Sequence, residues 1–118
     1  MKIIFIRHLR TPGNEKRQYI GRTDESLSDR ALEGFLSSKN RYPAVKSVIA
    51  SPMKRCIETA RLIYPEAEIR TEPLLRECDF GLFEGKTYEE LKDHPAYIEW
   101  LESGGMAAFP EGEPQELF

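Results

Sequence analysis

Blocks of apolar residues alternate with amphipathic stretches along the chain, which predicts that strands and helices follow one another. Residues 2–6 (Lys-Ile-Ile-Phe-Ile) form a continuous apolar run that is typical of a parallel strand covered on both faces. Residues 47–50 predict a second strand and residues 67–70 a third. This order predicts an α/β fold with a three-layer α/β/α arrangement and a mostly parallel sheet. Typical sheets have about five or six strands, so we expect the fold to be incomplete.

Two helices are predicted in the first half of the chain. Apolar residues at positions i, i+3 and i+4 predict a helix from about residue 28 to residue 38. Ser51 fits the N-cap of the next helix, and Pro52 fits its first helical position. Pro65 would end that helix, because proline cannot continue the hydrogen-bonded backbone.

The segment from residue 87 onwards predicts two further helices. Thr87, with Glu90 three residues later, has the form of a capping box, which starts a short helix. The next helix is expected to begin at Pro95, and we predict that Trp100 on it belongs to the core. His94 stands directly before this proline, in a sequence typical of a helix boundary, so we interpret it as structural or solvent-facing.

Composition and charge limit the function classes. The chain has 118 residues, of which 40% are hydrophobic and 31% charged, and these values are typical of one folded domain over residues 1–118. The sequence has no run of about 18 apolar residues, which argues against a membrane-spanning helix. The net charge of −3 argues against nucleic acid as a partner, since phosphate backbones require a broad basic face. Cys56 and Cys78 form no disulfide framework, so we expect a reducing, cytoplasmic setting.

The charge is unevenly distributed between the two halves of the chain. The first 59 residues carry 12 Lys and Arg against 6 Asp and Glu, whereas the last 59 carry 5 against 14. Two halves of one fold can simply differ in this way. Alternatively, the basic half can hold a site for an anion.

Side chains suited to phosphate chemistry follow the first two predicted strands. Arg7 and His8 come directly after residues 2–6, and Arg55 follows the second strand. The carboxyl ends of parallel strands meet at one edge of a sheet, where open α/β sheets bind ligands. Guanidinium groups bind phosphate oxygens in pairs, and a neutral imidazole can attack phosphorus. From these residues alone, a phosphate site and a simple packing role for His8 both remain open.

Four short motifs follow one another between residues 7 and 85. They are Arg-His-Leu-Arg-Thr at 7–11 with Asn14, Gly-Arg-Thr-Asp at 21–24 with Leu-Ser at 27–28, Ser-Pro-Met-Lys-Arg-Cys at 51–56 with Thr-Ala-Arg at 59–61, and Glu-Cys-Asp-Phe-Gly at 77–81 with Phe-Glu-Gly at 83–85. Their residues and their order resemble the signature of the histidine phosphatase superfamily, the phosphoglycerate-mutase-like proteins. The resemblance implies the α/β/α fold of that superfamily.

The resemblance also implies a role for each matching residue. His8 would be the nucleophile that becomes a phosphohistidine. Arg7 and Arg55 would bind the phosphoryl oxygens and stabilise the transition state, while Glu77 would protonate the leaving oxygen as a general acid. Because the arginines supply positive charge, no metal ion or other cofactor is expected. Further phosphate and substrate contacts would come from Asn14, Ile20 and Gly21.

The chain departs from the superfamily pattern at two points. Leu9 stands where such proteins usually have glycine, which adopts backbone conformations that leucine rarely adopts. The second histidine of their phosphate pocket follows a later strand, and no equivalent occurs within these 118 residues. We therefore expect the chain to correspond to the N-terminal part of such a protein. A second copy could close its open sheet edge, so a homodimer is an expected arrangement.

Three functions follow from the resemblance. The first is a phosphomonoesterase that works through a phosphohistidine on a small phosphorylated metabolite. The Gly-Arg-Thr-Asp sequence at 21–24 further resembles the alpha-ribazole phosphatases, which act on a precursor of the cobalamin lower ligand. The second function is that of a phosphoglycerate mutase, which returns the phosphoryl group to another hydroxyl. The third is a catalytically impaired domain that binds phosphate or a partner without turnover.

Overall fold

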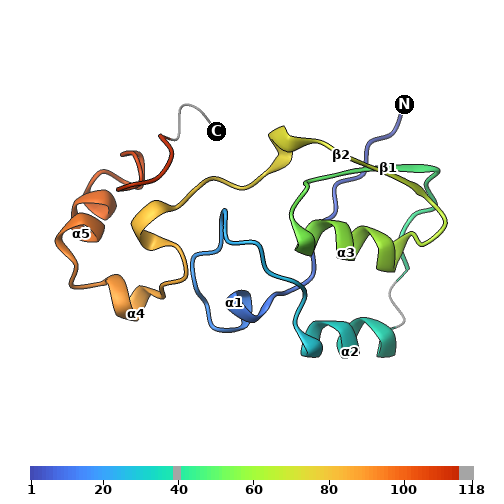
Figure 1. Cartoon of the computed structure of the whole chain (residues 1–118), viewed down its shortest axis with the longest axis horizontal. Helices are drawn as coiled ribbons and strands as arrows, with labels where there is room; N and C mark the ends of the chain where they lie inside the picture. The colour runs from blue at the N-terminus through green and yellow to red at the C-terminus, as the bar shows by residue number, and fades with distance from the viewer. Residues whose placement is uncertain (39–40, 115–118) are drawn as a thin grey trace. The chain divides into compact units, whose positions relative to one another are not determined.

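The computed structural model describes residues 1–38 and 41–114, and the chain divides into two compact units (Figure 1). Unit 1 comprises Met1–Thr11 and Glu25–Leu75, and unit 2 comprises Pro12–Asp24 and Arg76–Phe118. Each unit is therefore built from two separate stretches of sequence. The predicted α/β class is confirmed, because helices and a parallel pair of strands follow one another along the chain. The single domain expected over residues 1–118 stays a prediction.

Unit 1 is organised around a strand–helix–strand arrangement. Strand β1 (Ser47–Ala50) pairs in parallel with strand β2 (Glu68–Thr71), and helix α3 (Lys54–Ile63) connects them. Figure 1 shows α3 lying along this pair of strands, and α3 contacts both of them. A 3-10 turn, η1 (Pro73–Leu75), follows β2. The second and third predicted strands are thereby confirmed. The face of α3 that is buried carries Arg55, Thr59 and Ala60.

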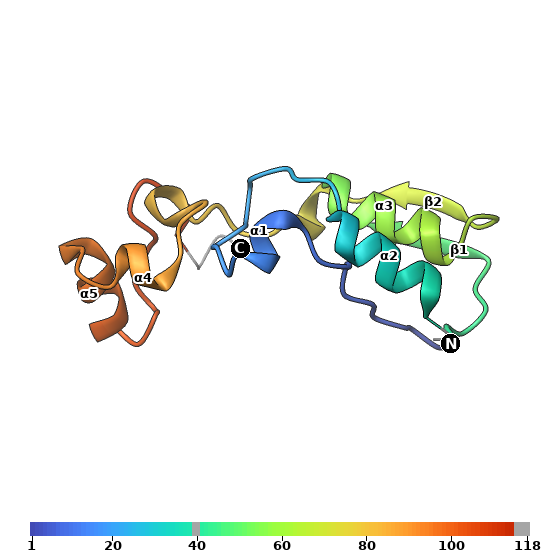
Figure 2. The same ribbon diagram turned by 90° about the horizontal axis from the view of Figure 1, so that it is seen from below.

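Helix α2 (Asp29–Ser37) runs beside α3 in both ribbon views (Figures 1 and 2). The helix begins where the sequence predicts, because the Ser28 hydroxyl oxygen accepts a hydrogen bond from the Ala31 amide at 3.1 Å. Just before the helix, the Leu27 amide donates to Glu58 Oε1 of α3 at 3.1 Å. The helix expected over residues 28–38 is thus confirmed and is held to α3 at its N-terminal end.

Residues 2–6 do not form the strand that their apolar run predicts. In the described part of the chain they are assigned to no strand, and Ile3 and Phe5 are 64% and 92% exposed. A strand covered on both faces needs a hydrogen-bonding neighbour and packed layers above and below it. The sheet that the structure describes consists of β1 and β2 paired with each other, so this first predicted strand is wrong here.

Helix α3 begins two residues later than the sequence predicts. Met53 is its N-cap residue and makes no side-chain cap hydrogen bond, so the assignment of Ser51 as N-cap and Pro52 as first helical position is wrong. The Ser51 hydroxyl oxygen instead accepts from the Met53 amide at 3.4 Å, within the turn that precedes the helix. A serine followed by proline suits such a turn as well as it suits a helix start, and local sequence does not separate the two.

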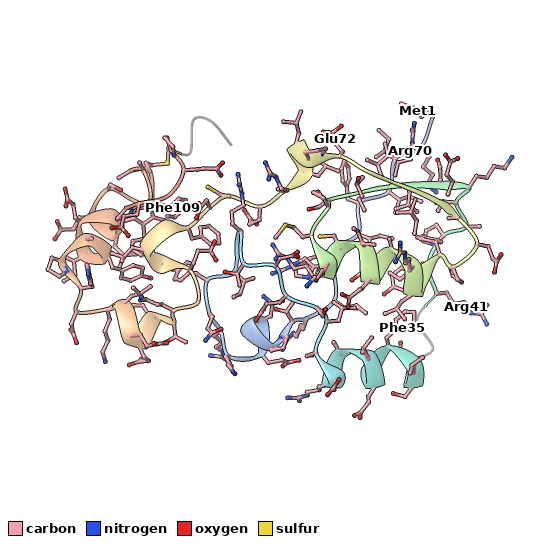
Figure 3. The ribbon with its side chains drawn as sticks, in the orientation of Figure 1. Met1, Phe35, Arg41, Arg70, Glu72 and Phe109 are labelled. Carbon is pink, nitrogen blue, oxygen red and sulfur yellow. The ribbon has the colours of Figure 1, made fainter. Side chains whose placement is uncertain are left out.

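Unit 2 packs short helices around an aromatic core. Its elements are α1 (Pro12–Glu15), a 3-10 turn η2 (Gly81–Phe83), α4 (Tyr88–Leu91) and α5 (Pro95–Glu102). The Phe83 side chain is fully buried. Its ring packs edge-on against the ring of Tyr97, with 5.1 Å between the two ring centroids. Figure 3 shows Phe109 among the side chains of this core. Trp100 packs against the same cluster, which confirms its predicted place in the core.

The helix starts predicted in unit 2 are confirmed by their caps. Thr87 and Glu90 form the expected capping box, with the Glu90 amide donating to Thr87 Oγ1 at 3.3 Å and the Thr87 amide donating to Glu90 Oε1 at 3.1 Å. His94 is exposed, and its Nδ1 accepts from the Ala96 amide at 3.1 Å, which makes it the N-cap of α5. The structural interpretation of His94 is therefore correct. Among residues 1–38 and 41–114, none of the helices is long and apolar enough to cross a membrane.

Replacing Phe83 by alanine should destabilise unit 2 strongly. The Phe83 ring contacts the rings of Tyr19, Tyr97 and Trp100, and truncation would leave a cavity among them. We expect Phe83→Ala to lower the free energy of unfolding by about 3–5 kcal/mol, measured by urea denaturation. Phe5→Ala is the matched control and should change stability by less than about 0.5 kcal/mol, because the Phe5 ring is exposed. Equal losses in the two variants would contradict this assignment of the core.

Candidate active site

The His8 ring is oriented by the main chain of the next residue. His8 is half-buried, and its Nδ1 lies 2.5 Å from the carbonyl oxygen of Leu9. A carbonyl oxygen only accepts hydrogen bonds, so a neutral ring in this contact carries its proton on Nδ1 and its lone pair on Nε2. This tautomer is the one in which Nε2 can act as a nucleophile.

Hydrogen bonds connect the His8 segment to α3. The Leu9 amide donates to Thr59 Oγ1 at 3.0 Å, and Thr59 Oγ1 donates to the Arg55 carbonyl oxygen at 2.7 Å. Arg55 lies one helical turn before Thr59 and is only 2% exposed. A guanidinium matches phosphate oxygens with paired N–H donors, so an arginine joined to the His8 segment in this way is a candidate anion ligand. Unit 1 thus links the predicted nucleophile and the predicted phosphate-binding arginine through their backbones.

Leu9 occupies its position without backbone strain. Within the described residues, the non-glycine residues with positive φ are Arg17 and Glu111, and Leu9 is not among them. Leucine therefore does not need the conformational freedom that glycine would provide at this position. The departure from the superfamily pattern at residue 9 therefore requires no positive φ beside His8.

In unit 2, the loop of residues 20–23 lies directly on the segment of residues 77–80. Gly21 is buried, and a Cβ atom on it would lie 2.0 Å from the carbonyl oxygen of Cys78. No side chain fits at that distance, so only glycine permits this close approach. The predicted substrate loop at Ile20 and Gly21 and the predicted acid at Glu77 therefore belong to two segments in direct contact.

The carboxylate of Glu84 holds this loop through hydrogen bonds with several donors. The Arg22 amide donates to it at 2.7 Å and the Thr23 hydroxyl at 2.7 Å. The amides of Gly21 and Phe80 each donate at 3.1 Å. Sequence reasoning missed this role, although Glu84 lies in the Phe-Glu-Gly motif. The available signal was an acidic residue directly before a glycine, but its partners in residues 21–23 are more than 60 residues away in sequence.

The environment of Glu84 keeps its carboxyl ionised. Burial by itself would raise the pKa of this group, but the hydrogen bonds from Thr23, Gly21, Arg22 and Phe80 together outweigh burial and lower the pKa below the ordinary value of 4.5. A folded-state pKa below the unfolded value means that the ionised form favours folding. This contribution is complete above about pH 4.5 and is lost as the pH falls through the folded-state pKa.

Replacing Glu84 by glutamine should therefore remove an acid-sensitive contribution to stability. A glutamine presents an NH₂ group to donors that need an acceptor, and we expect the free energy of unfolding at pH 7 to fall by about 2 kcal/mol. The wild-type protein should lose stability towards pH 3, so that its curve approaches that of the variant. Denaturant titrations at several pH values measure both effects. Glu99→Gln, an exposed position on α5, is the control, and an unchanged difference at all pH values would contradict the assignment.

Glu77 is exposed in unit 2, and its surroundings constrain its main chain. Glu77 Oε1 accepts from the Cys78 amide at 2.9 Å, and the Glu77 carbonyl oxygen accepts from Arg22 Nε at 3.1 Å.

Cys78 is buried, and burial together with the negative charge of Glu113 raises the pKa of its thiol to about 11. The Cys78 thiol therefore stays protonated near neutral pH and is a weak nucleophile.

The two cysteines should differ in reactivity. At pH 8, a thiol with a pKa of about 11 is ionised in only about one molecule in a thousand, so Cys78 should be alkylated slowly by iodoacetamide. Cys56 is only half-buried on α3 and should react first, as peptide mass spectrometry would show. In urea both should react at similar rates. Equal rates in the native protein would contradict the burial of Cys78.

The predicted site residues are divided between the two units. Unit 1 contains Arg7, His8 and Arg55, and unit 2 contains Asn14, Ile20, Gly21 and Glu77. Arg7 is exposed, whereas Asn14, on α1, and Ile20 are half-buried. Within the ranges that the structure describes, no group of three or more His, Cys, Asp or Glu side chains is arranged to hold a metal ion.

Comparison with known proteins tests the resemblance on which the four motifs depend. The sequence profile of the histidine phosphatase superfamily (branch 1) matches residues 3–118. The chain belongs to this superfamily. The match confirms the expectation drawn from the four motifs, and it extends over nearly the whole sequence.

Individual relatives of this chain carry different names. The crystal structure of the alpha-ribazole phosphatase from Shigella flexneri is similar, with a TM-score of 0.78 and 26% identity over 96% of this chain and 59% of that one. A probable phosphoglycerate mutase from an Enterobacter species is 28% identical over 99% of this chain and 58% of its own length. A bifunctional protein from Mycobacterium tuberculosis is 28% identical over 95% of this chain. The chain spans 32% of that protein, so all three relatives are considerably longer.

Proposed function

We propose that this chain is a phosphomonoesterase that forms a phosphohistidine at His8. The observation that carries the proposal is the contact between His8 Nδ1 and the Leu9 carbonyl oxygen, because it leaves the lone pair on Nε2. The backbone connection from Leu9 through Thr59 to the buried Arg55 supports it, since a phosphoryl acceptor needs positive charge nearby. Membership of the superfamily supports the same reaction class.

The proposed reaction has two steps. In the first, Nε2 of His8 attacks the phosphorus, a P–N bond forms, and the P–O ester bond breaks as Glu77 gives its proton to the leaving oxygen. In the second, water attacks the phosphorus and gives a proton to the Glu77 carboxylate. The P–N bond then breaks, which releases inorganic phosphate and restores the lone pair on Nε2. Arg7 and Arg55 would balance the negative charge of the phosphoryl oxygens in both steps.

The substrate that we propose is a small phosphorylated metabolite of the alpha-ribazole phosphate type. The likeness to the Shigella flexneri alpha-ribazole phosphatase supports this choice, as does the Gly-Arg-Thr-Asp sequence at 21–24. A phosphoglycerate mutase activity is the second candidate, because the Enterobacter relative is named for it. We further propose a cytoplasmic location and a homodimer.

A chain that binds phosphate without turnover is the third candidate. The chain has two histidines, and His94 caps α5 through its ring Nδ1, which leaves His8 as the candidate for phosphate chemistry. A phosphate pocket with one histidine favours binding without turnover. Substrate binding by Asn14, Ile20 and Gly21, taken from the resemblance, would apply to this candidate as well as to the enzymes.

The test compares the two histidines of the chain. We expect the wild-type protein to release phosphate from p-nitrophenyl phosphate and His8→Ala to lose at least about a hundredfold of that rate. His94→Asn is the matched control, because asparagine is also a good N-cap and should preserve α5. Circular dichroism of each variant confirms that it is folded.

The product identifies the candidate. Phosphate release from alpha-ribazole phosphate supports the proposed substrate, whereas isomerisation of 3-phosphoglycerate supports the mutase. A folded wild-type chain that binds phosphate but turns over neither ester would overturn the phosphatase proposal. It would support the third candidate, a chain that binds phosphate without turnover. Equal activity in His8→Ala and wild type would exclude His8 as the nucleophile.

A further inference from the structure

A second set of polar contacts joins residues 20–23 to residues 77–80, in addition to the hydrogen bonds of the Glu84 carboxylate. Arg22 Nε donates to the carbonyl oxygen of Glu77 at 3.1 Å, and Arg22 Nη2 forms an ion pair with Glu113 Oε1. We propose that Arg22 is a positioning residue for the Glu77 side chain during protonation of the leaving group. This inference rests on the proposed phosphatase reaction, in which Glu77 is the general acid.

Both ends of the Arg22 residue are fixed. Its amide donates to Glu84 Oε1 at 2.7 Å, so its backbone is held by the half-buried carboxylate. Its guanidinium reaches two acceptors on different segments, the Glu77 carbonyl oxygen and the Glu113 carboxylate. A planar guanidinium presents several N–H donors in fixed directions, whereas a lysine ammonium is a single point charge on a flexible stem. Arginine is therefore suited to holding two acceptors in a defined relation.

Glu113 fixes the other side of the acid segment. Its Oε2 accepts from the Asp79 amide at 2.9 Å, and its own amide donates to the Asp79 carbonyl oxygen at 3.0 Å. The Asp79 hydrogen bond lowers the pKa of the Glu113 carboxyl, and the Arg22 charge lowers it further, against the raising effect of burial. The carboxylate therefore stays ionised at neutral pH. Arg22 and Glu113 together hold the main chain on both sides of Cys78.

The position of the Glu77 backbone matters because the Glu77 side chain is exposed. Its carboxyl has no burial to restrict it, and the hydrogen bond from the Cys78 amide to Oε1 depends on the local main-chain geometry. A general acid must lie within hydrogen-bond reach of the leaving oxygen, and a displacement of about 1 Å can reduce the rate by about a hundredfold. Loss of the Arg22 contact should therefore impair protonation rather than phosphate binding.

Two substrates with different leaving groups separate these effects. A p-nitrophenolate leaves readily without a proton, whereas an alkoxide from glycerol 2-phosphate must be protonated. We expect Glu77→Gln to lower kcat for glycerol 2-phosphate by about a hundredfold and Arg22→Met to lower it by about tenfold. For p-nitrophenyl phosphate, the first step needs no proton from Glu77, so the burst of p-nitrophenolate in the first turnover should stay within about threefold of wild type in Arg22→Met. Arg61→Met, an exposed arginine on α3, is the matched control and should resemble wild type.

A double variant tests the dependence on Glu77. If Arg22 acts through Glu77, then adding Arg22→Met to Glu77→Gln should cause no further loss on glycerol 2-phosphate. Multiplied losses on glycerol 2-phosphate, an equally slowed burst of p-nitrophenolate in Arg22→Met, or a rise in KM alone would overturn the positioning role. If circular dichroism shows that Arg22→Met is unfolded, then Glu113→Gln, which removes the ion-pair charge, replaces it in the same comparison. A wild-type chain inactive on both esters would overturn the proposed function and this inference with it, whereas an active wild type with multiplied losses overturns the inference alone.

Discussion

The hydrogen bonds to the Glu84 carboxylate are the constraint on which the organisation of unit 2 depends. One partly buried anion accepts from the amide of Gly21, which lies 63 residues earlier in the chain, and from the amide of Phe80 in its own segment. Two stretches of sequence are joined in this way through their backbone amides. The helices of this unit are short, and α1 and α4 have only four residues each, so regular secondary structure alone would not hold the loop.

The carboxylates of unit 2 have different environments, and each environment suits a different role. Glu84 is surrounded by donors and Glu113 is paired with Arg22, so both are structural anions near neutral pH. A carboxylate that is committed to several donors cannot also release and recover a proton during a reaction. Glu77 is exposed, and its carboxyl accepts from the neighbouring Cys78 amide, so it differs from both of these anions in the way that the proposed role of general acid requires.

Local sequence was sufficient for the elements whose cause is local. The Thr87 capping box and the His94 boundary were predicted because the capping side chain and its amide partner are two or three residues apart. The strand predicted at residues 2–6 is absent. An apolar run indicates only that a segment can be buried, whereas a strand also needs a neighbouring strand to form hydrogen bonds with. The contacts of Glu84 with residues 21–23 and those of Arg22 were missed because these partners are more than 50 residues away, although both residues lie in the motifs of the family resemblance.

The exposed apolar segment at the N-terminus has a consequence for the protein in concentrated solution. Residues 3–6 carry no charge, and Ile3, Phe5 and Ile6 are all open to solvent. An extended apolar stretch outside a sheet is a template for pairing with the same stretch of another molecule. Lys2 and Arg7 flank it, and their like charges oppose such stacking at low ionic strength. Salt screens that repulsion. Self-association through residues 2–7 should therefore increase with ionic strength, because the apolar attraction remains while the charge repulsion weakens.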